Sequence, residues 1–456
     1  MASEPALLPL LACPRCDQPL KEDGEAPGCP GCRTVFPLLD GVPWLFADPD
    51  TALAEWRQRF DFALADIARD EQAAAAALEQ GGLLASTERR LRRQVEAWRA
   101  HAEELKTLLA PLGAGASEAT YETYLALRTR LPTEAGLTAY YSNIHRDWAW
   151  GDEENRQSLE AVSEALAGGT PGRLLVPGAG AGRLAYDLHQ SLQAELTVAL
   201  YFNPLPVLAA ARLCAGVTVP LHEFPIAPRT AADVAVARQL AAPAAARPGL
   251  HHVLASALRP PFREGAFDTL VTPWLVDVLP EDLAVQAARW NRLLAEGGRW
   301  VWFGSAAFRT PSPAENYSLE EALEIIAQAG FGEPSLAERE IPYMDSPASR
   351  HGRRERVVIV VAEKTADAPR PPRHKALPDW LVTGSEPVPA LEDFRVQAVS
   401  TRVHAFIMSM IDGRRSIGDM AKLMEEKRLM TRTEAENAIR GFFIRMYEDS
   451  RRPPPL

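Results

Sequence analysis

Three glycines at alternate positions in the middle of the chain constrain its fold more than any other feature. They follow a short apolar run at residues 173–177, which indicates a buried strand, and apolar periodicity resumes at residues 184–188 as in a helix. A strand, a glycine-rich turn and a helix together form the cofactor loop of doubly wound α/β domains. Glycine suits such a loop because the backbone can turn sharply and approach a ligand with no Cβ between them.

The spacing of Gly178, Gly180 and Gly182 narrows the choice of ligand. A dinucleotide fingerprint would place its third glycine at position 183, where this chain has Arg183. The pattern G-x-G-x-G is instead typical of S-adenosylmethionine (SAM) methyltransferases. SAM has no phosphate, so its loop needs close backbone approach more than a complete anion cradle. We therefore predict that the three glycines bind SAM, the alternative being a glycine-rich turn of another α/β enzyme.

Beyond this loop, strands alternate with helices up to about residue 364. The expected strands lie at residues 196–200, 253–258, 267–272, 299–304 and 356–362. Residues 217–250 are rich in Ala and Pro and are expected to be an insertion. The alternation predicts an α/β fold: a Rossmann-like, doubly wound and mostly parallel sheet covered on both faces, with ligands at the carboxyl ends of its strands.

Two polar residues are expected at that edge of the sheet. The position after the second strand that usually provides an acid for the ribose hydroxyls is apolar, so Asn203 is the nearest polar candidate for holding the cofactor. Asp277 lies just beyond the fourth strand. A carboxylate there could orient a nucleophilic nitrogen or accept its proton, so we predict Asp277 as the catalytic residue. A helix cap or a surface position is the alternative for Asp277.

Four cysteines near the start of the chain form two C-x-x-C knuckles. Cys13 and Cys16 form the first, Cys29 and Cys32 form the second, and twelve residues separate the two. Four thiolates at this separation can surround one Zn²⁺ tetrahedrally and leave no position open for chemistry. We therefore predict a structural zinc ribbon over residues 1–50. A redox-active or chance set of cysteines is the alternative.

Composition excludes several functional classes. A formal net charge of -11 over 456 residues does not favour nucleic-acid binding, and no apolar run approaches membrane-spanning length. The N-terminus lacks the basic segment of a secretory signal, and only Cys214 lies outside the two knuckles. Cysteines arranged for a metal suit a reducing compartment. We therefore expect a cytoplasmic protein with neither a membrane nor nucleic acid as its partner.

The segment between the ribbon and the cofactor domain, residues 51–168, is expected to be a helical lead-in. It is rich in Ala, Leu, Glu and Arg and is interrupted by Gly81-Gly82, which predicts two long helices with a break. An aromatic-dense stretch at residues 140–150 directly precedes the cofactor domain. Aromatic faces near a sulfonium would gain cation–π attraction, and a simple packing corner is the alternative.

The cofactor domain is expected at residues 169–364, followed by a Pro-, Lys- and Arg-rich linker at residues 365–380. Residues 381–456 are then expected to form a small helical domain similar to a winged helix. Its three short helices are indicated by apolar periodicity and by a capping box at Thr431 and Glu434.

Several of these segments resemble the carnosine N-methyltransferase family, from about residue 88 to residue 364. The resemblance rests on Arg146-Asp147-Trp148, Leu175-Val-Pro-Gly-Ala-Gly-x-Gly-Arg-Leu-Ala185, Asp277 and Gly297-Gly-x-Trp-x-x-x-Gly304. It implies SAM-dependent methylation of an imidazole nitrogen in a histidine-containing dipeptide. It also implies that Arg146 contacts the cofactor and that Asp277 contacts the imidazole of the substrate.

The chain departs from that family at both sides of the site. Leu200 stands where the family has its ribose acid, and the Gly-Asp near the adenine is replaced around Ser256, which becomes a cofactor candidate. A substrate-site histidine appears as Arg309, and a tyrosine-rich stretch appears as residues 351–355, whereas the region of Tyr343 matches. We predict substrate contacts for Arg309 and Tyr343. The new arginines would suit an acidic or carboxylate-bearing acceptor.

Both ends of the chain resemble other families. The first fifty or so residues resemble small zinc-ribbon proteins, some of which are activating subunits of tRNA and protein methyltransferases. In the tail, Ile411-Asp-Gly-Arg-Arg-Ser-Ile417 resembles the PqqD-like peptide-recognition fold. These resemblances imply that a protein partner or a peptide docks on the ribbon or on the C-terminal domain.

The sequence as a whole predicts a SAM-dependent N-methyltransferase with SAM and a structural Zn²⁺ as its cofactors. The methyl acceptor would be a small molecule or a peptide, with an imidazole nitrogen as the first candidate. Two alternatives stay open. One is a non-catalytic scaffold built on a degenerate methyltransferase fold, and the other is a peptide or protein methyltransferase whose tail recruits the substrate.

Overall fold

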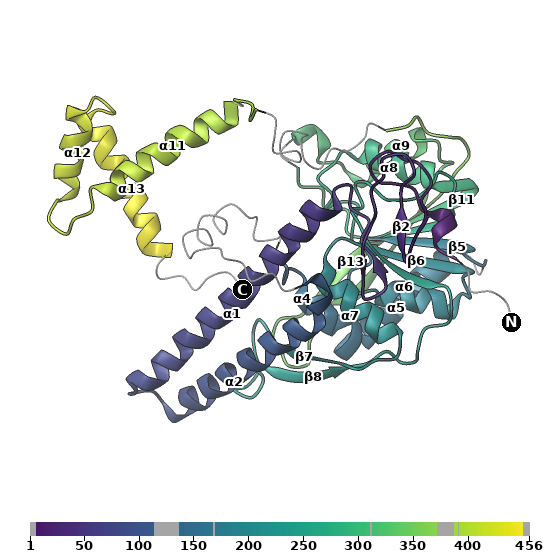
Figure 1. Ribbon diagram of the computed structural model, residues 1–456, viewed down its shortest axis with the longest axis horizontal. Coiled ribbons are helices and arrows are strands. Elements are labelled where there is room, and N and C mark those ends of the chain that lie inside the picture. Colours follow the sequence, from purple (N-terminus) through teal and green to yellow (C-terminus); the bar gives the residue numbers. More distant parts are fainter. Residues whose placement is uncertain are drawn as a thin grey trace. The chain divides into compact units, whose positions relative to one another are not determined.

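The computed structural model describes residues 6–113, 136–166, 169–310, 312–371, 387–390 and 392–449. The chain forms two compact units, Met1–Ala376 and Leu377–Leu456. The first unit contains a central sheet covered by helices, and the described part of the second unit contains three helices (Figure 1). Among the described residues, no helix is both long and apolar enough to span a membrane.

A seven-stranded sheet forms the centre of the first unit. Its strands, in spatial order, are β12 (Ser335–Tyr343), β13 (Arg353–Glu363), β11 (Leu294–Gly304), β10 (Phe267–Pro273), β5 (Arg173–Pro177), β6 (Leu196–Tyr201) and β9 (Leu250–Leu254). β13 is antiparallel to both of its neighbours, and the remaining pairs are parallel. The carboxyl ends of the other six strands therefore meet at one edge, which is where such sheets bind ligands.

Six of the seven strands were predicted from the sequence, with differences at their ends. β9 ends at Leu254, so Ser256 lies in the loop beyond the strand and not inside it. β11 already begins at Leu294 and includes Gly297, whose φ of 69° accompanies an irregular register against β10. The prediction missed β12, whose first four residues are exposed and whose sequence shows no alternation of apolar and polar side chains.

Helices cover both faces of the sheet. On one face, α5 (Asp152–Ala165) and α6 (Arg183–Ser191) pack their apolar sides against the strands, and on the other α8 (Leu283–Leu293) and α9 (Leu319–Gln328) do so. Successive side chains of β11 point to opposite faces of the sheet. Trp300 and Trp302 pack on the face covered by α8 and α9, and Val301 and Phe303 pack on the face covered by α5 and α6. The Ser318–Glu321 capping box that opens α9 is present, as expected from the sequence.

The cysteine-bearing segment completes the cover of the second face. The connection from β9 to β10 (residues 255–266) contains no helix. The ribbon lies there instead: Ala12 N donates to Pro261 O at 2.9 Å, and Leu45 N donates to Leu254 O at 2.7 Å. Buried ribbon residues share one apolar core with the sheet; they are Leu11, Cys13, Leu20, Cys29, Phe36 and Leu45. Its own strands are short: β1 (Lys21–Asp23), β2 (Ala26–Gly28), β3 (Leu38–Leu39) and β4 (Val42–Pro43).

The lead-in contains the two long helices expected from the sequence. α1 (Pro49–Gln80) and α2 (Ala85–Leu108) lie side by side as a hairpin (Figure 1), and both Gly81 and Gly82 between them have positive φ. After the undescribed residues 114–135, a short helix α4 (Tyr141–His145) continues directly into a π-helical turn at Arg146–Trp150. π-helical turns are rare and are frequent at functional sites.

The expected insertion at 217–250 is a separate β-hairpin after α7 (Pro204–Cys214). Its strands, β7 (Val219–Glu223) and β8 (Val236–Leu240), pair with each other and not with the central sheet. The hairpin packs on the lead-in, because His222 N and Nδ1 both lie within 3 Å of the Glu104 carboxylate, at 2.9 and 2.8 Å.

The second unit has a core of its own. It consists of α11 (Glu392–Ser409), α12 (Ile417–Glu426) and α13 (Arg432–Asp449), around an apolar cluster that includes Met420 and Ile439. The capping box at Thr431 and Glu434 is present. The described residues of this unit are helical without a strand, so the wing of a winged helix is not among them. The predicted linker at 365–380 is described only to residue 371, and Ala368 N within it bonds Asn291 Oδ1 at 2.9 Å.

Candidate functional site

The glycine loop lies at the carboxyl end of β5, where the sheet order places a ligand. Gly178 N donates to Leu200 O at 2.9 Å, which joins the loop to the end of β6. Gly178, Gly180 and Gly182 have φ values of 76°, 58° and 83°, all in the region that favours glycine. A Cβ added at Gly180 would meet nothing within 4 Å, whereas a Cβ at Gly178 would contact Leu275. The middle glycine therefore faces open space into which a cofactor can approach.

The π-helical turn of the lead-in holds this loop. Trp148 Nε1 donates to Ala181 O at 2.8 Å, and the Arg183 guanidinium lies over the Trp148 ring. Arg183 Nη1 donates to Asp147 O at 2.8 Å. The backbone of this turn is crowded as well, because a Cβ at Gly151 would lie 2.3 Å from Arg146 O. The lead-in is thus bonded to the cofactor loop through neighbouring residues of the Arg146-Asp147-Trp148 motif.

Arg146, a predicted cofactor contact, is paired with two carboxylates. Its Nη2 lies 2.6 Å from Asp147 Oδ1, and its Nη1 lies 3.2 Å from Glu154 Oε1. Burial opposes its charge, but Asp147 and Glu154 outweigh burial and raise the pKa of Arg146. Glu154 also accepts a hydrogen bond from Met344 N at 2.9 Å, so this cluster connects the lead-in to the end of β12. A direct contact between Arg146 and a cofactor stays a prediction. The sequence had not singled out Glu154.

Asn203 and Ser256, the other two cofactor candidates, are placed differently. Asn203 is the buried N-cap of α7: its Oδ1 accepts from Leu205 N at 3.0 Å and its Nδ2 donates to Leu137 O at 2.9 Å. Both polar ends of its amide are therefore used within the protein. Ser256 is half-buried in the loop after β9, and its Oγ accepts from Leu258 N at 3.2 Å.

Asp277 has one carboxylate oxygen in use and one without a partner. Oδ2 accepts a hydrogen bond from Ala307 N at 3.0 Å, which ties the loop after β10 to the loop after β11. Oδ1 is buried and has no hydrogen-bond partner among the described residues. An unpaired buried carboxylate oxygen is costly unless a ligand provides a donor, so Asp277 fits the role of a group that receives an N–H.

The two predicted substrate residues lie at the same edge. Tyr343 is the last residue of β12, and its ring centroid lies 4.7 Å from that of Trp274, while the Arg353 guanidinium lies 4.7 Å from the Tyr343 ring. Burial raises the pKa of Tyr343, against the opposing effect of the Arg146 cation. Arg309 is exposed in the loop that follows β11.

Trp274 is a feature that sequence reasoning missed. It directly follows β10 and has a φ of 51°, although it is not glycine, and its N–H donates to Phe303 O at 2.8 Å. Backbone strain of this kind clusters at functional sites. Its position immediately after a predicted strand could have indicated that Trp274 lies at the ligand-binding edge of the sheet.

The four ribbon cysteines converge. All four Sγ atoms lie within 4.8 Å of one another, with 3.6 Å between Cys13 and Cys32 and 3.3 Å between Cys16 and Cys29. Tetrahedral thiolates on Zn²⁺ would be about 3.8 Å apart, so the spacing fits one ion. Burial raises the pKa of Cys13 and of Cys16. Burial also opposes ionisation of Cys32, but hydrogen bonds from the side chain and backbone of Thr34 and from the neighbouring thiols lower its pKa to about 6. The spacing of the four sulfur atoms suits a metal that binds thiolates.

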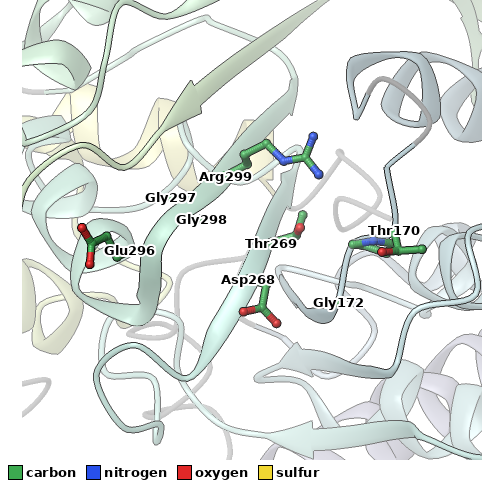
Figure 2. A pocket seen from close by; sticks show the side chains of 9 residues that line it. Thr170, Gly172, Asp268, Thr269, Glu296, Gly297, Gly298 and Arg299 are labelled. Carbon is green, nitrogen blue, oxygen red and sulfur yellow. The ribbon is translucent and has the colours of Figure 1, made fainter.

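A surface hollow lies at the opposite edge of the sheet. It has a volume of about 370 Å³ and is lined by the amino ends of β5 and β10 and by the first part of β11, including Asp268 and Arg299 (Figure 2). The Arg173 guanidinium pairs with Asp268 there at 2.9 Å. Ligands of open α/β sheets bind at the carboxyl ends of the strands, so this hollow is not the candidate site.

The strand order, with a single antiparallel strand next to the edge, is typical of Rossmann-like methyltransferases. No protein-family model matches the chain, and no curated protein does. Among solved structures, it is similar to a SAM-dependent methyltransferase from Thermotoga maritima (14% identity, 54% of this chain and 98% of that chain, TM-score 0.29).

Two further solved structures are similar to parts of the chain. One is the N-methyltransferase NodS from Bradyrhizobium japonicum (15% identity, 50% of this chain and 98% of that chain, TM-score 0.31). The other is phosphoethanolamine N-methyltransferase 2 from Haemonchus contortus (13% identity, 51% of this chain and 59% of that chain, TM-score 0.33). All three TM-scores are below 0.5, so the fold assignment rests on the strand order and the glycine loop.

Proposed function

We propose that the protein is a SAM-dependent N-methyltransferase. The observation that supports this best is the glycine loop: three glycines with positive φ at the carboxyl end of β5, the middle one facing open space, in a sheet of the order found in methyltransferases. The residues that would hold SAM are Gly178, Gly180 and Gly182, with the lead-in turn behind them.

The chain's own residues would position the reactants. Bound SAM supplies an electrophilic methyl group on a sulfonium, and direct displacement by a nitrogen requires the two to be in line. Asp277 would accept an N–H of the acceptor at its unpartnered Oδ1, which orients the lone pair and gives the released proton a destination. The bond from Ala307 N to Oδ2, which that N–H shares with Ser305 Oγ, restrains the carboxylate and leaves Oδ1 as the oxygen open to the acceptor.

The acceptor would be a small molecule or a peptide with a nucleophilic nitrogen. An imidazole nitrogen of a histidine-type compound is the first candidate, on the resemblance at Arg146-Asp147-Trp148 and Asp277. Tyr343 and Trp274 would provide an aromatic wall for such a ring. Arg309, which is exposed at the same edge, would suit a carboxylate on the acceptor.

A structural Zn²⁺ on Cys13, Cys16, Cys29 and Cys32 is part of the same proposal. The four thiols converge within 4.8 Å, and the ligand set is closed. The metal would therefore stabilise the ribbon and take no part in methyl transfer.

One observation favours a second function, that of a non-catalytic scaffold. The end of β6 offers no free acid for the ribose hydroxyls, because Leu200 is fully buried and both polar ends of the Asn203 amide are used inside the protein. A domain of this kind would keep the fold and use the ribbon or the tail to dock partners.

Calorimetry with SAM on zinc-replete protein separates these two functions. Binding in the micromolar range supports the enzyme, and no binding by the folded protein rejects it. Gly180→Ala should weaken SAM binding at least about tenfold, or about 1.4 kcal/mol, because its Cβ enters the space for the cofactor. Gly81→Ala is the matched control, since Gly81 also has positive φ and open space but lies between the lead-in helices.

A second measurement tests the catalytic residue. In a screen of imidazole dipeptides and histidine peptides, Asp277→Ala should lower turnover at least about a hundredfold with an unchanged Kd for SAM. Unchanged turnover in this variant would remove Asp277 from the mechanism.

A further inference from the structure

Helix α6 begins directly after the glycine loop and lacks a capping side chain of its own. Its N-cap is Gly182, so the first turn must find an acceptor elsewhere. The Asp147 carboxylate lies there: Oδ2 is 3.4 Å from Arg183 N, the first N–H of the helix. In dinucleotide-binding domains this helix N-terminus holds the pyrophosphate. In this protein a carboxylate from the lead-in already lies at that position.

Asp147 is fixed in this place from several directions. Its Oδ1 accepts from Arg146 Nε at 2.7 Å and from Arg146 Nη2 at 2.6 Å, and the residue is only 3% exposed. Its main-chain oxygen accepts from Arg183 Nη1 at 2.8 Å and from Asn155 Nδ2 at 3.1 Å. The carboxylate cannot turn away from the helix without breaking the pair with Arg146. The Asp147 carboxylate is therefore a fixed part of the glycine loop's surroundings in the ligand-free protein.

The surroundings of Asp147 strengthen its effect on charge. Glu154 shares the Arg146 guanidinium, and Asp187 pairs with Arg183 at 2.9 Å. When ionised, these three carboxylates face two guanidinium groups, which leaves one negative charge beside the glycine loop, and the exposed Asp152, 3.8 Å from Arg183 Nη1, adds a further one. A phosphate placed there would meet a like charge in a poorly solvated position, whereas a cation would be attracted.

We propose that Asp147 is a specificity-determining residue, which excludes phosphorylated nucleotides from the glycine loop by occupying their anion position at the start of α6. SAM fits the same loop because it has no phosphate and its sulfonium and ammonium groups give it a net positive charge. The choice of SAM over a dinucleotide then depends on this carboxylate as much as on the glycine spacing. The part that concerns SAM rests on the proposed function, but the exclusion of phosphate does not.

The wild-type protein alone provides a first test. Adenosine, AMP and ADP differ only in their phosphates, and calorimetry should show affinity falling in that order, at least about tenfold from adenosine to ADP. Binding of ADP as tight as that of adenosine would overturn the proposal. This measurement needs no variant, so it decides the matter even where a substitution prevents folding.

The Asp147→Asn variant should reduce or remove that difference, with ADP binding at least about tenfold tighter than to the wild type. Glu154→Gln is the matched control, because it removes an equal formal charge and the second carboxylate partner of Arg146, at 3.2 Å, but does not touch the helix N-terminus. Its ADP affinity should stay within about threefold of the wild type. Equal gains in the two variants, or no gain in Asp147→Asn, would overturn the proposal.

SAM is titrated in parallel with the nucleotides. Failure of the wild type to bind SAM would reject the proposed function, while the nucleotide series would still decide whether Asp147 excludes phosphate. The two failures are therefore distinguishable.

Discussion

The indole Nε1 of Trp148 donates a 2.8 Å hydrogen bond to the carbonyl oxygen of Ala181, inside the glycine loop. Ala181 is fully buried, and Trp148 is only 5% exposed. A buried carbonyl that loses its donor costs about 1–3 kcal/mol. This bond makes the conformation of the cofactor loop depend on a residue that precedes the sheet domain in the sequence.

Replacing Trp148 by Phe should therefore disturb the loop while it keeps an aromatic ring in place. We expect the free energy of unfolding to fall by about 1–3 kcal/mol and SAM affinity to fall at least about tenfold. Urea denaturation and calorimetry measure the two effects. Trp44→Phe is the control, because Trp44 Nε1 makes an equivalent 3.0 Å bond to Pro49 O in the ribbon segment. An equal loss of SAM affinity in both variants would contradict a specific role for Trp148.

The convergent cysteines predict one zinc ion per chain. Metal analysis of the purified protein should find it, and Cys29→Ser should abolish it and lower Tm by more than about 5 °C, because the metal contributes folding free energy to the ribbon. Cys214→Ala should keep the metal, since Cys214 is buried in α7 outside this set. Retention of zinc by Cys29→Ser would show that the four thiols do not form the site.

Asp187 should lower the free energy of unfolding as the pH rises from about 4 to about 6. Burial raises its pKa from 3.8 to about 6, with Asp147 and Asp152 adding to the rise and Arg183 opposing it. Below about pH 4 the carboxyl is mostly protonated in the folded and the unfolded chain, so it does not lower the free energy of unfolding. Between about pH 4 and 6 only the unfolded chain ionises freely, and the penalty grows to about 3 kcal/mol at roughly 1.4 kcal/mol per pH unit.

The matched variant for this prediction is Asp187→Asn, whose amide oxygen can still accept from Arg183 Nε. Its free energy of unfolding, relative to the wild type, should increase from pH 4 to pH 6.5 and then level off. Urea denaturation of both proteins at several pH values measures the difference. A difference that is independent of pH would mean that Asp187 ionises as easily in the folded chain as in the unfolded one.

Removing residues 377–456 should leave the first unit folded, because each unit has its own core. We expect the SAM affinity of the shortened chain to stay within about twofold of the full chain. If the tail recognises a peptide, its removal should raise KM for a peptide acceptor and leave KM for a small acceptor unchanged. An equal rise for both kinds of acceptor would argue against recruitment by the tail, and loss of SAM binding would contradict the independence of the two units.

Features written in local sequence were predictable, and features made by contacts between distant segments were not. The glycine spacing and the capping boxes involve neighbours in the chain, so their patterns predicted the loop and the helix ends. β12 was not predicted because its exposed first residues show no alternation of apolar and polar side chains. At the site, the sequence drew attention to Arg146 through a resemblance, but the buried pairs with Asp147 and Glu154 depend on how the lead-in packs.

The connection between β9 and β10 contains no helix, and the ribbon covers the sheet there. Binding of Zn²⁺ to the ribbon would therefore affect the stability of the sheet as well as that of the ribbon. A chain without zinc would lose the cover of an apolar face of its sheet, with Cys13, Cys29 and Phe36 among the core residues lost. Such a chain would expose this face to proteases and chaperones. The amount of folded protein in a cell would then follow the supply of zinc during synthesis.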